Sequence, residues 1–170
     1  ALPICVPAKI IVWAHNSHLG DARATQQSNS GEFNVGQLMR QQYASEVYSL
    51  GFTTYEGHVT AASEWGASAE RKSVNPGLDG SYEKLFHQLG FERFLYIFKN
   101  NQQLREILPS RLLERAIGVV YLPQSERSSH YFYANIANQF DAVIHIDTTE
   151  ALKPLEKYAP TPKEDAPETF

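Results

Sequence analysis

The stretch Ile10-Ile11-Val12-Trp13-Ala14-His15-Asn16-Ser17-His18 is the most informative part of this chain. It begins with a short apolar run, which is typical of the parallel strands of α/β proteins. Two histidines and an amide follow the run directly. Because α/β folds place their ligands at the carboxyl ends of the strands, the sequence predicts a strand over residues 9–14 and a functional site at its end, around His15 and His18.

Three interpretations of the two histidines stay open at this point. His15, His18 and Asp21 follow one another at steps of three, so a helical segment would bring them to one face, where they could hold a metal ion. Without a metal, neutral imidazoles could orient a substrate or relay protons. In the third interpretation, the histidines only cap the end of the strand by hydrogen bonds.

Strand and helix patterns alternate along the rest of the chain. Apolar runs predict further strands over residues 47–55, 93–98, 116–122 and 142–146, with 58–62 extending the first of these or forming another. Helical spacing and capping residues predict helices over residues 35–43, 82–89, 102–108 and from Ser128 or Ser129 through 136. Residues 63–80 are predicted to form a long loop. The alternation indicates an α/β fold, a mostly parallel sheet with flanking helices.

The composition is that of an ordinary soluble globular domain. The 170 residues are 42% hydrophobic and 20% charged, with a net charge of −4 and no cluster of Lys and Arg of the kind that binds nucleic acid. No apolar run approaches the ~20 residues of a membrane span. The single cysteine, Cys5, excludes an intrachain disulfide and fits a reducing cytoplasm. We therefore expect a cytoplasmic protein that binds neither nucleic acid nor membranes.

A second polar cluster covers residues 126–131 and follows the predicted strand over 116–122. It should lie at the same sheet edge as the first histidine pair, because parallel strands share a carboxyl edge. Glu126 and His130 are four residues apart and could meet on one helical face. The alternative is a plain helix start, at which the helix dipole favours an acidic residue.

The other histidines are predicted to be structural. His145 and Asp147 end the last predicted strand and point the same way, so a buried histidine satisfied by its neighbours is expected there. His58 and His87 lie at a strand edge and a helix flank, and we expect no functional role for either. Trp65, in the long loop, either walls a substrate pocket or covers the core.

Common catalytic and nucleotide-binding motifs do not occur in the chain: it has no G-x-S-x-G, Walker loop, G-x-G-x-x-G or H-E-x-x-H. Its sequence does resemble a known family. The segment 13–25 resembles the signature of the erythromycin esterase family. Further blocks resemble the family in the same order, so the similarity runs from about Lys9 to Leu155. These blocks are 36–38, 60–62 with 65–66, 81–87, 114–121, 126–127 with 129–132, and 139–147.

The resemblance implies an α/β hydrolase more than twice the length of this chain. Its members are expected to use a histidine of a G-E-x-x-H-G motif in the N-terminal half as general base. That histidine activates water against an ester carbonyl, which opens the lactone ring in the macrolide-inactivating members. For this chain the resemblance implies no cofactor and no metal, and it places His15 and His18 in the active site with Asn16 as their neighbour. Taken with the second polar cluster and the long loop, we expect catalytic residues at His15, His18 and His130 and substrate-binding residues at Asn16, Arg23, Trp65 and Glu126.

The chain departs from the family pattern in that it contains no G-E-x-x-H-G motif. It also starts at Ala1 rather than Met, and residues 1–8 do not match the family. We therefore expect the chain to be the C-terminal half of a larger domain, with the family-like α/β region over 9–147. Residues 148–170 hold four of the nine prolines and are expected to be extended and poorly ordered.

Two functional hypotheses follow from these observations. In the first, the chain is part of a carboxylic-ester hydrolase of macrolactone type that gives macrolide resistance, and it is inactive alone because the base is missing. In the second, it is a truncated, non-catalytic domain that binds a small molecule or a partner. The expected partners are a small-molecule ester and, through exposed apolar surface, a second copy or a missing N-terminal half.

Overall fold

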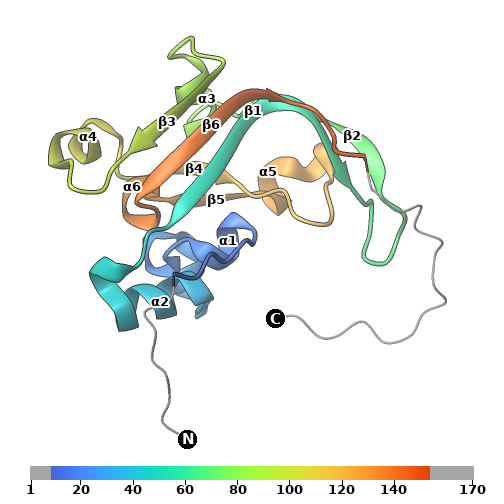
Figure 1. Ribbon diagram of the computed structural model, residues 1–170. Coiled ribbons are helices and arrows are strands. Elements are labelled where there is room, and N and C mark those ends of the chain that lie inside the picture. Colours follow the sequence, from blue (N-terminus) through green and yellow to red (C-terminus); the bar gives the residue numbers. More distant parts are fainter. Residues whose placement is uncertain (1–8, 154–170) are drawn as a thin grey trace, which may run out of the picture.

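The computed structural model describes residues 9–153, which fold around two sheets. The larger sheet has the strand order β2-β1-β6-β3, and the smaller pairs β4 with β5 (Figure 1). Pairing is parallel between β1 and β6 and antiparallel elsewhere. The strands are β1 (Leu50–Ala61), β2 (Glu70–Val74), β3 (Arg93–Ile97), β4 (Leu112–Arg115), β5 (Tyr131–Ala134) and β6 (Ala142–Thr149).

Short helices connect and flank these strands (Figure 1). The α-helices are α1 (Asn16–Leu19), α2 (Val35–Tyr43), α3 (Tyr82–His87), α4 (Gln102–Ile107), α5 (Glu126–Ser129) and α6 (Ile136–Gln139). The 3₁₀ turns are η1 (Ala22–Ala24), η2 (Gln26–Ser30), η3 (Ala44–Glu46) and η4 (Pro123–Ser125).

Side-chain caps explain where several of the helices begin. Asn34 accepts a hydrogen bond from the backbone N–H of Gln37 (2.9 Å), and Ser81 accepts one from Lys84 (3.1 Å). A side-chain oxygen at this position satisfies a backbone N–H that has no partner inside the helix. Both helix starts are therefore confirmed as the sequence predicts them.

The core lies between one face of the larger sheet and α3. Val143 and His145 of β6 point into it and are fully buried, and the ring of Phe86 from α3 packs edge-on against His145 with centroids 5.5 Å apart. Ile136 and Phe140, around α6, belong to the same buried cluster. This cluster fixes the curved sheet above β4 and β5.

The fold class agrees with the sequence analysis in kind and differs in strand direction. The molecule is an α/β fold with helices flanking a sheet, as predicted. The sheet is mixed rather than mostly parallel, because β1 with β6 is the one parallel pair among its four strands and the two outer pairings are antiparallel. Residues 70–74, predicted as loop, form β2 through antiparallel pairing with β1.

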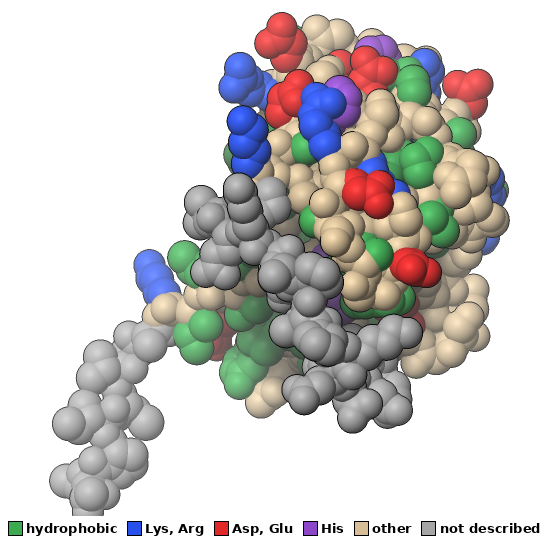
Figure 2. Space-filling view, turned by 90° about the vertical axis from the view of Figure 1, so that its right-hand side faces the viewer, with side chains coloured by type: hydrophobic (Ala, Val, Ile, Leu, Met, Phe, Trp, Pro, Cys, Tyr) green, Lys and Arg blue, Asp and Glu red, His purple; other side chains and the backbone are tan. Residues whose placement is uncertain are grey.

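The predicted strand over residues 9–14 is wrong. These residues form an irregular arm that stands away from the body of the molecule (Figure 2). Ile11 is 92% exposed and Trp13 86% exposed. A strand needs a neighbour to satisfy its backbone groups, and no strand of the described residues 9–153 pairs with this segment.

Two other predicted elements are also wrong. Residues 116–122 do not form the predicted strand. They make a single isolated β-bridge, from Val120 to Ala62, which lies just beyond the end of β1 at Ala61. The helix predicted through residue 136 stops at Ser129, since residues 131–134 pair with β4 instead. In both places long-range pairing overrides the local pattern.

The ends of the described region limit what can be compared with the sequence analysis. The predicted extended tail starts at residue 148, but β6 continues to Thr149. Residues 1–8 and 154–170, which include most of that tail, lie outside the described residues. Over the part that is described, no helix has the length and apolar character needed to cross a membrane.

Candidate functional site

His15 is held at the start of α1 with both ring nitrogens engaged. Its Nδ1 accepts a hydrogen bond from the backbone N–H of Ser17 (3.2 Å), and its Nε2 lies 3.0 Å from the carbonyl oxygen of Ile117. Because a backbone N–H can only donate, the ring proton sits on Nε2 and is donated to Ile117. Burial lowers the pKa of His15, and the nearby His18 lowers it further, against the opposing hydrogen bond to Ile117. The imidazole is therefore neutral at neutral pH.

His18 is the available imidazole of the pair. It is exposed, and its ring lies edge-on to that of His15 with centroids 6.3 Å apart. Neither of its ring nitrogens makes a hydrogen bond to another residue within 9–153. Of the two histidines, His18 is the one whose ring nitrogens are open to a ligand within the described residues.

Asn16 anchors α1 to the edge of the sheet. Its side-chain amide donates to the carbonyl oxygen of Phe52 (2.7 Å) and its side-chain oxygen accepts from the N–H of the same residue (3.0 Å). The side chain thus pairs with β1 as a neighbouring strand would. A substrate contact for Asn16 stays a prediction, and it would compete with these two bonds.

Asp21 and Arg23 form a two-pronged ion pair. Arg23 donates from Nε to Oδ1 (2.9 Å) and from Nη2 to Oδ2 (2.6 Å). Burial alone would raise the pKa of Asp21, but the hydrogen bonds and charge of Arg23 outweigh it and lower the pKa. Both oxygens of the Asp21 carboxylate are therefore bound to Arg23. Among residues 9–153, no group of three or more His, Cys, Asp and Glu side chains is arranged to hold a metal ion.

His130 is buried and saturated in the same way as His15. Its Nε2 accepts from the N–H of Leu122 (2.9 Å), and its Nδ1 lies 3.1 Å from the carbonyl oxygen of Ala116. The structure thus attaches His15 and His130 to the consecutive residues Ile117 and Ala116. The two segments predicted to meet do lie close together, although neither follows a strand of the kind expected.

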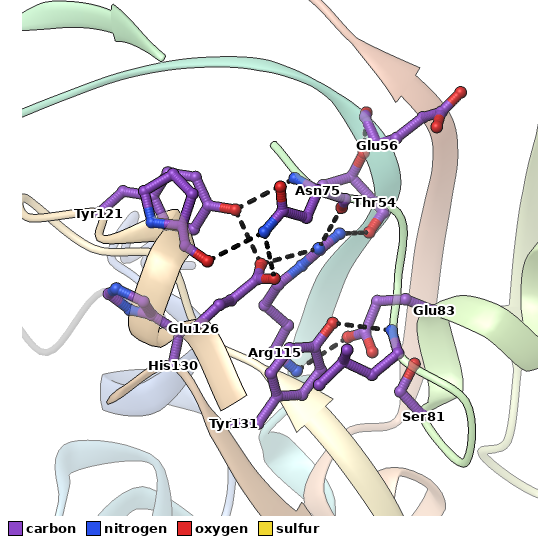
Figure 3. Close-up of polar contacts among 12 residues, drawn as sticks. Thr54, Glu56, Asn75, Ser81, Glu83, Arg115, Tyr121, Glu126, His130 and Tyr131 are labelled. Carbon is purple, nitrogen blue, oxygen red and sulfur yellow. Dashed lines mark hydrogen bonds and ion pairs between the residues drawn. The ribbon is translucent and has the colours of Figure 1, made fainter. Parts of the chain in front are cut away.

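Glu126 belongs to a buried ion pair (Figure 3). One carboxylate oxygen accepts from Arg115 Nη1 (3.0 Å) and from the hydroxyl of Tyr121 (2.8 Å), and the other accepts from Asn75 Nδ2 (3.2 Å). Arg115 Nη2 donates in addition to the carbonyl oxygens of Thr54 and Tyr55 in β1. The pair joins β4 and α5 to β1, and both carboxylate oxygens of Glu126 accept hydrogen bonds from within the fold.

Trp65 and His145 lie apart from this cluster, whereas His58, for which the sequence predicts no role, lines a cavity together with Ile117. Trp65 is 75% exposed in the turn between β1 and β2, and its predicted substrate contact stays a prediction. His145 is fully buried, with Nδ1 3.0 Å from Thr53 Oγ1 and Nε2 3.4 Å from Asp147. This confirms the expected buried, structural histidine of the last strand, although β6 continues beyond it to Thr149.

An open cavity of about 340 Å³ lies along β1 and the end of β6 and includes Ile117, whose carbonyl oxygen binds His15. Thr54 and His58 of β1, Thr149 of β6 and the carbonyl-bearing Ile117 line it, together with Glu150. His15 therefore touches one residue of the cavity lining through the Ile117 carbonyl, while neither His15 nor His18 itself lines the cavity. The lining residues come from three segments that are far apart in the sequence: β1, residues 117–118, and the end of β6 with the residues that follow it. No local sequence pattern could therefore have predicted this cavity.

These features define an α/β domain in which a segment with two histidines is fastened to β1 by Asn16 and to the cavity residue Ile117 by His15. The model of the family described as Erythromycin esterase matches residues 3–149. This chain therefore belongs to the erythromycin esterase family.

The relatives agree with this assignment and are much longer. The chain is 22% identical over 144 residues to the Escherichia coli protein named Erythromycin esterase type II, which covers 82% of this chain and 31% of that protein. The fold of this chain is similar to the crystal structure of a succinoglycan biosynthesis protein, with a TM-score of 0.66 and 21% sequence identity. The match covers 82% of this chain and 32% of that one. A Bacillus cereus protein of known structure is similar to the same degree (TM-score 0.65, 18% identity, 82% and 33%). The chain thus spans about a third of the length of these relatives.

Proposed function

We propose that this chain is part of a cytoplasmic hydrolase that cleaves carboxylic esters of the macrolactone type, with macrolide resistance as its biological effect. Family membership supports the reaction class. The observation that carries the proposal is the arrangement of the two histidines at the start of α1. His15 is neutral and bonded to Ile117, a residue of the cavity lining, and His18 is exposed with ring nitrogens that bind no other residue within 9–153.

The two histidines take different roles in this proposal. Hydrolysis adds water oxygen to the ester carbonyl carbon, removes a proton from that water, and returns a proton to the alcohol oxygen as the ester C–O bond breaks. His18 relays a proton or orients the ester, because its ring nitrogens are accessible. His15 acts as a positioning residue that fixes α1 against Ile117. His130 plays the same structural part from α5, since both of its ring nitrogens are bound.

The general base is not supplied by these 170 residues, because they contain no G-E-x-x-H-G motif. This favours a second candidate function, a non-catalytic domain that binds a small molecule or a partner. The two candidates differ in what the site does to a bound ester, and they agree that the histidine segment should contact it.

A binding experiment tests the contact directly. Isotope-labelled chain is titrated with erythromycin, and the imidazole signals of the histidines are followed by NMR. We expect a saturable shift of the His18 signals, and weaker binding for His18→Asn than for the control His87→Asn, which lies on α3. Unchanged His18 signals, or equal binding by both variants, would refute the proposed site.

A further inference from the structure

One face of the larger sheet is apolar and uncovered. The strand register places Phe52, Ile144 and Leu95 side by side on this face, across β1, β6 and β3. The neighbouring rows add Ile97 beside Ala142, and Ile146 between Thr54 and Arg93. We call Phe52, Leu95, Ile97, Ile144 and Ile146 the bare face. Leu95 is 54% exposed, Ile97 43%, Phe52 41% and Ile146 39%.

The opposite face shows what a covered sheet looks like in the same strands. Val143 and His145, which alternate with Ile144 and Ile146 along β6, are fully buried under α3 and the Phe86 cluster. Side chains of successive residues point to opposite faces. β6 therefore carries apolar residues on both sides but is covered on one side only.

Apolar residues on both sides of a strand are typical of a strand whose two faces are both covered by other elements. A sheet with one solvated face alternates apolar and polar residues, whereas a strand covered on both faces reads as a continuous apolar run. Residues 94–97 of β3 and 142–146 of β6 read in the second way, with His145 the one polar exception. Helices are the usual cover for each face of such a sheet.

The N-terminal arm leads onto the bare face. The ring of Trp13 lies against that of Phe52 with centroids 5.8 Å apart, and the residues before it, Ile10 to Val12, are exposed and apolar. The chain covers only 31–33% of its relatives' lengths, so two thirds of a family domain has no counterpart in it. The arm and the face are continuous with each other, and together they form one surface without a cover.

We infer that the bare face is a docking surface for apolar faces of amphipathic helices from the remaining two thirds of an erythromycin-esterase-like domain. Such helices present apolar residues at i, i+3, i+4 and i+7, a stripe that fits a flat row of Ile, Leu and Phe side chains. The inference rests on family membership and on the bare face, and not on hydrolysis by the histidine segment.

The test is co-purification with a defined probe. The part of the Escherichia coli erythromycin esterase type II that lies outside the matched third is tagged and co-expressed with this chain. We expect this chain to co-purify with the probe. The double variant Leu95→Lys/Ile146→Lys should lose co-purification at least tenfold, while the control Ile107→Lys, at a 70% exposed apolar residue of α4, should retain it. Circular dichroism checks that each variant keeps its fold.

Three results would overturn the inference. The chain alone could form a dimer by light scattering that the double variant breaks, which would make a second copy the occupant. The double variant could co-purify as well as the wild-type chain, which would place the contact elsewhere. The folded chain could remain a monomer and capture nothing. Because no substrate is present, the result is independent of whether the site hydrolyses esters.

Discussion

At the scale of single residues, the hydrogen-bond partners separate the histidines into two kinds. His15 and His130 use both ring nitrogens to bind backbone groups, and His18 uses neither within the described chain. The sequence indicates that these residues belong to a site. It cannot say which nitrogens are occupied, because the partners lie at Ile117, Ala116 and Leu122, and His15 is 102 residues from its partner.

The buried pair of Arg115 and Glu126 gives a prediction at this scale. Arg115→Met leaves the Glu126 carboxylate buried without its cation and removes donors from three backbone carbonyls. Loss of one partner of a buried pair costs about 3–5 kcal/mol, so we expect the free energy of unfolding in urea to fall by that amount. The control Arg71→Ala breaks an exposed pair with Glu150 and should cost less than about 1 kcal/mol. Similar losses for the two variants would contradict a structural role for Glu126.

A buried acid that the sequence does not mark gives a second prediction. Burial, reinforced by the charge of Glu83, raises the pKa of Glu114 well above its usual range, and one of its oxygens has no partner among the described residues. The unfolded chain ionises Glu114 near its ordinary pKa of 4.5, while the folded chain keeps it protonated to higher pH. Between these two values the unfolded state binds fewer protons, so stability falls as the pH rises.

The variant Glu114→Gln isolates this effect. It keeps the shape and removes the ionisation, so its stability relative to the wild type should increase as the pH rises from 5 to 8. The gain has a ceiling of about 1.4 kcal/mol per pH unit. The comparison between variant and wild type is needed because burial lowers the pKa values of His15 and His145, and these histidines make the stability of both proteins rise with pH. Urea unfolding at several pH values checks it, and a pH-independent difference would show that Glu114 is ionised in the folded chain.

At the scale of elements, local signals predict the capped and periodic segments well. Asn34 and Ser81 start their helices as expected, and β1, β3 and β6 lie where apolar runs predict strands. The failures are segments whose structure depends on a distant partner. Residues 9–14 have no neighbour to pair with, and residues 131–134 form a strand because β4 pairs with them. Periodicity contains no information about either.

The anchoring of α1 gives the prediction at this scale. Asn16→Ala removes two hydrogen bonds to Phe52 and should lower the free energy of unfolding by about 1–3 kcal/mol. Asn16→Asp keeps the acceptor for the Phe52 N–H but sets a carboxylate oxygen against the Phe52 carbonyl oxygen, so its loss should be at least as large as that of Asn16→Ala. Chemical denaturation measures both variants. No loss for either would leave Asn16 available as a substrate-binding residue alone.

At the scale of the whole molecule, the chain is an α/β unit with one covered and one uncovered sheet face. The sequence predicts exposed apolar surface from its family resemblance, and the structure confirms it at Leu95, Ile97 and the arm around Trp13. The covered face and the histidine segment come from residues 15–149, which the family model matches. The general base that the family resemblance implies has no counterpart among the 170 residues.

We propose that this chain holds the substrate-contacting part of an ester hydrolase site without its base. The most direct measurement incubates the purified chain with erythromycin and follows, by mass spectrometry, a product heavier by one water. We predict that hydrolysis stays at the rate of the buffer control, because loss of a general base typically costs 10²-fold to 10⁴-fold in rate. Robust turnover by the chain alone, abolished by His18→Asn, would contradict the claim and show that these residues carry a complete catalytic site.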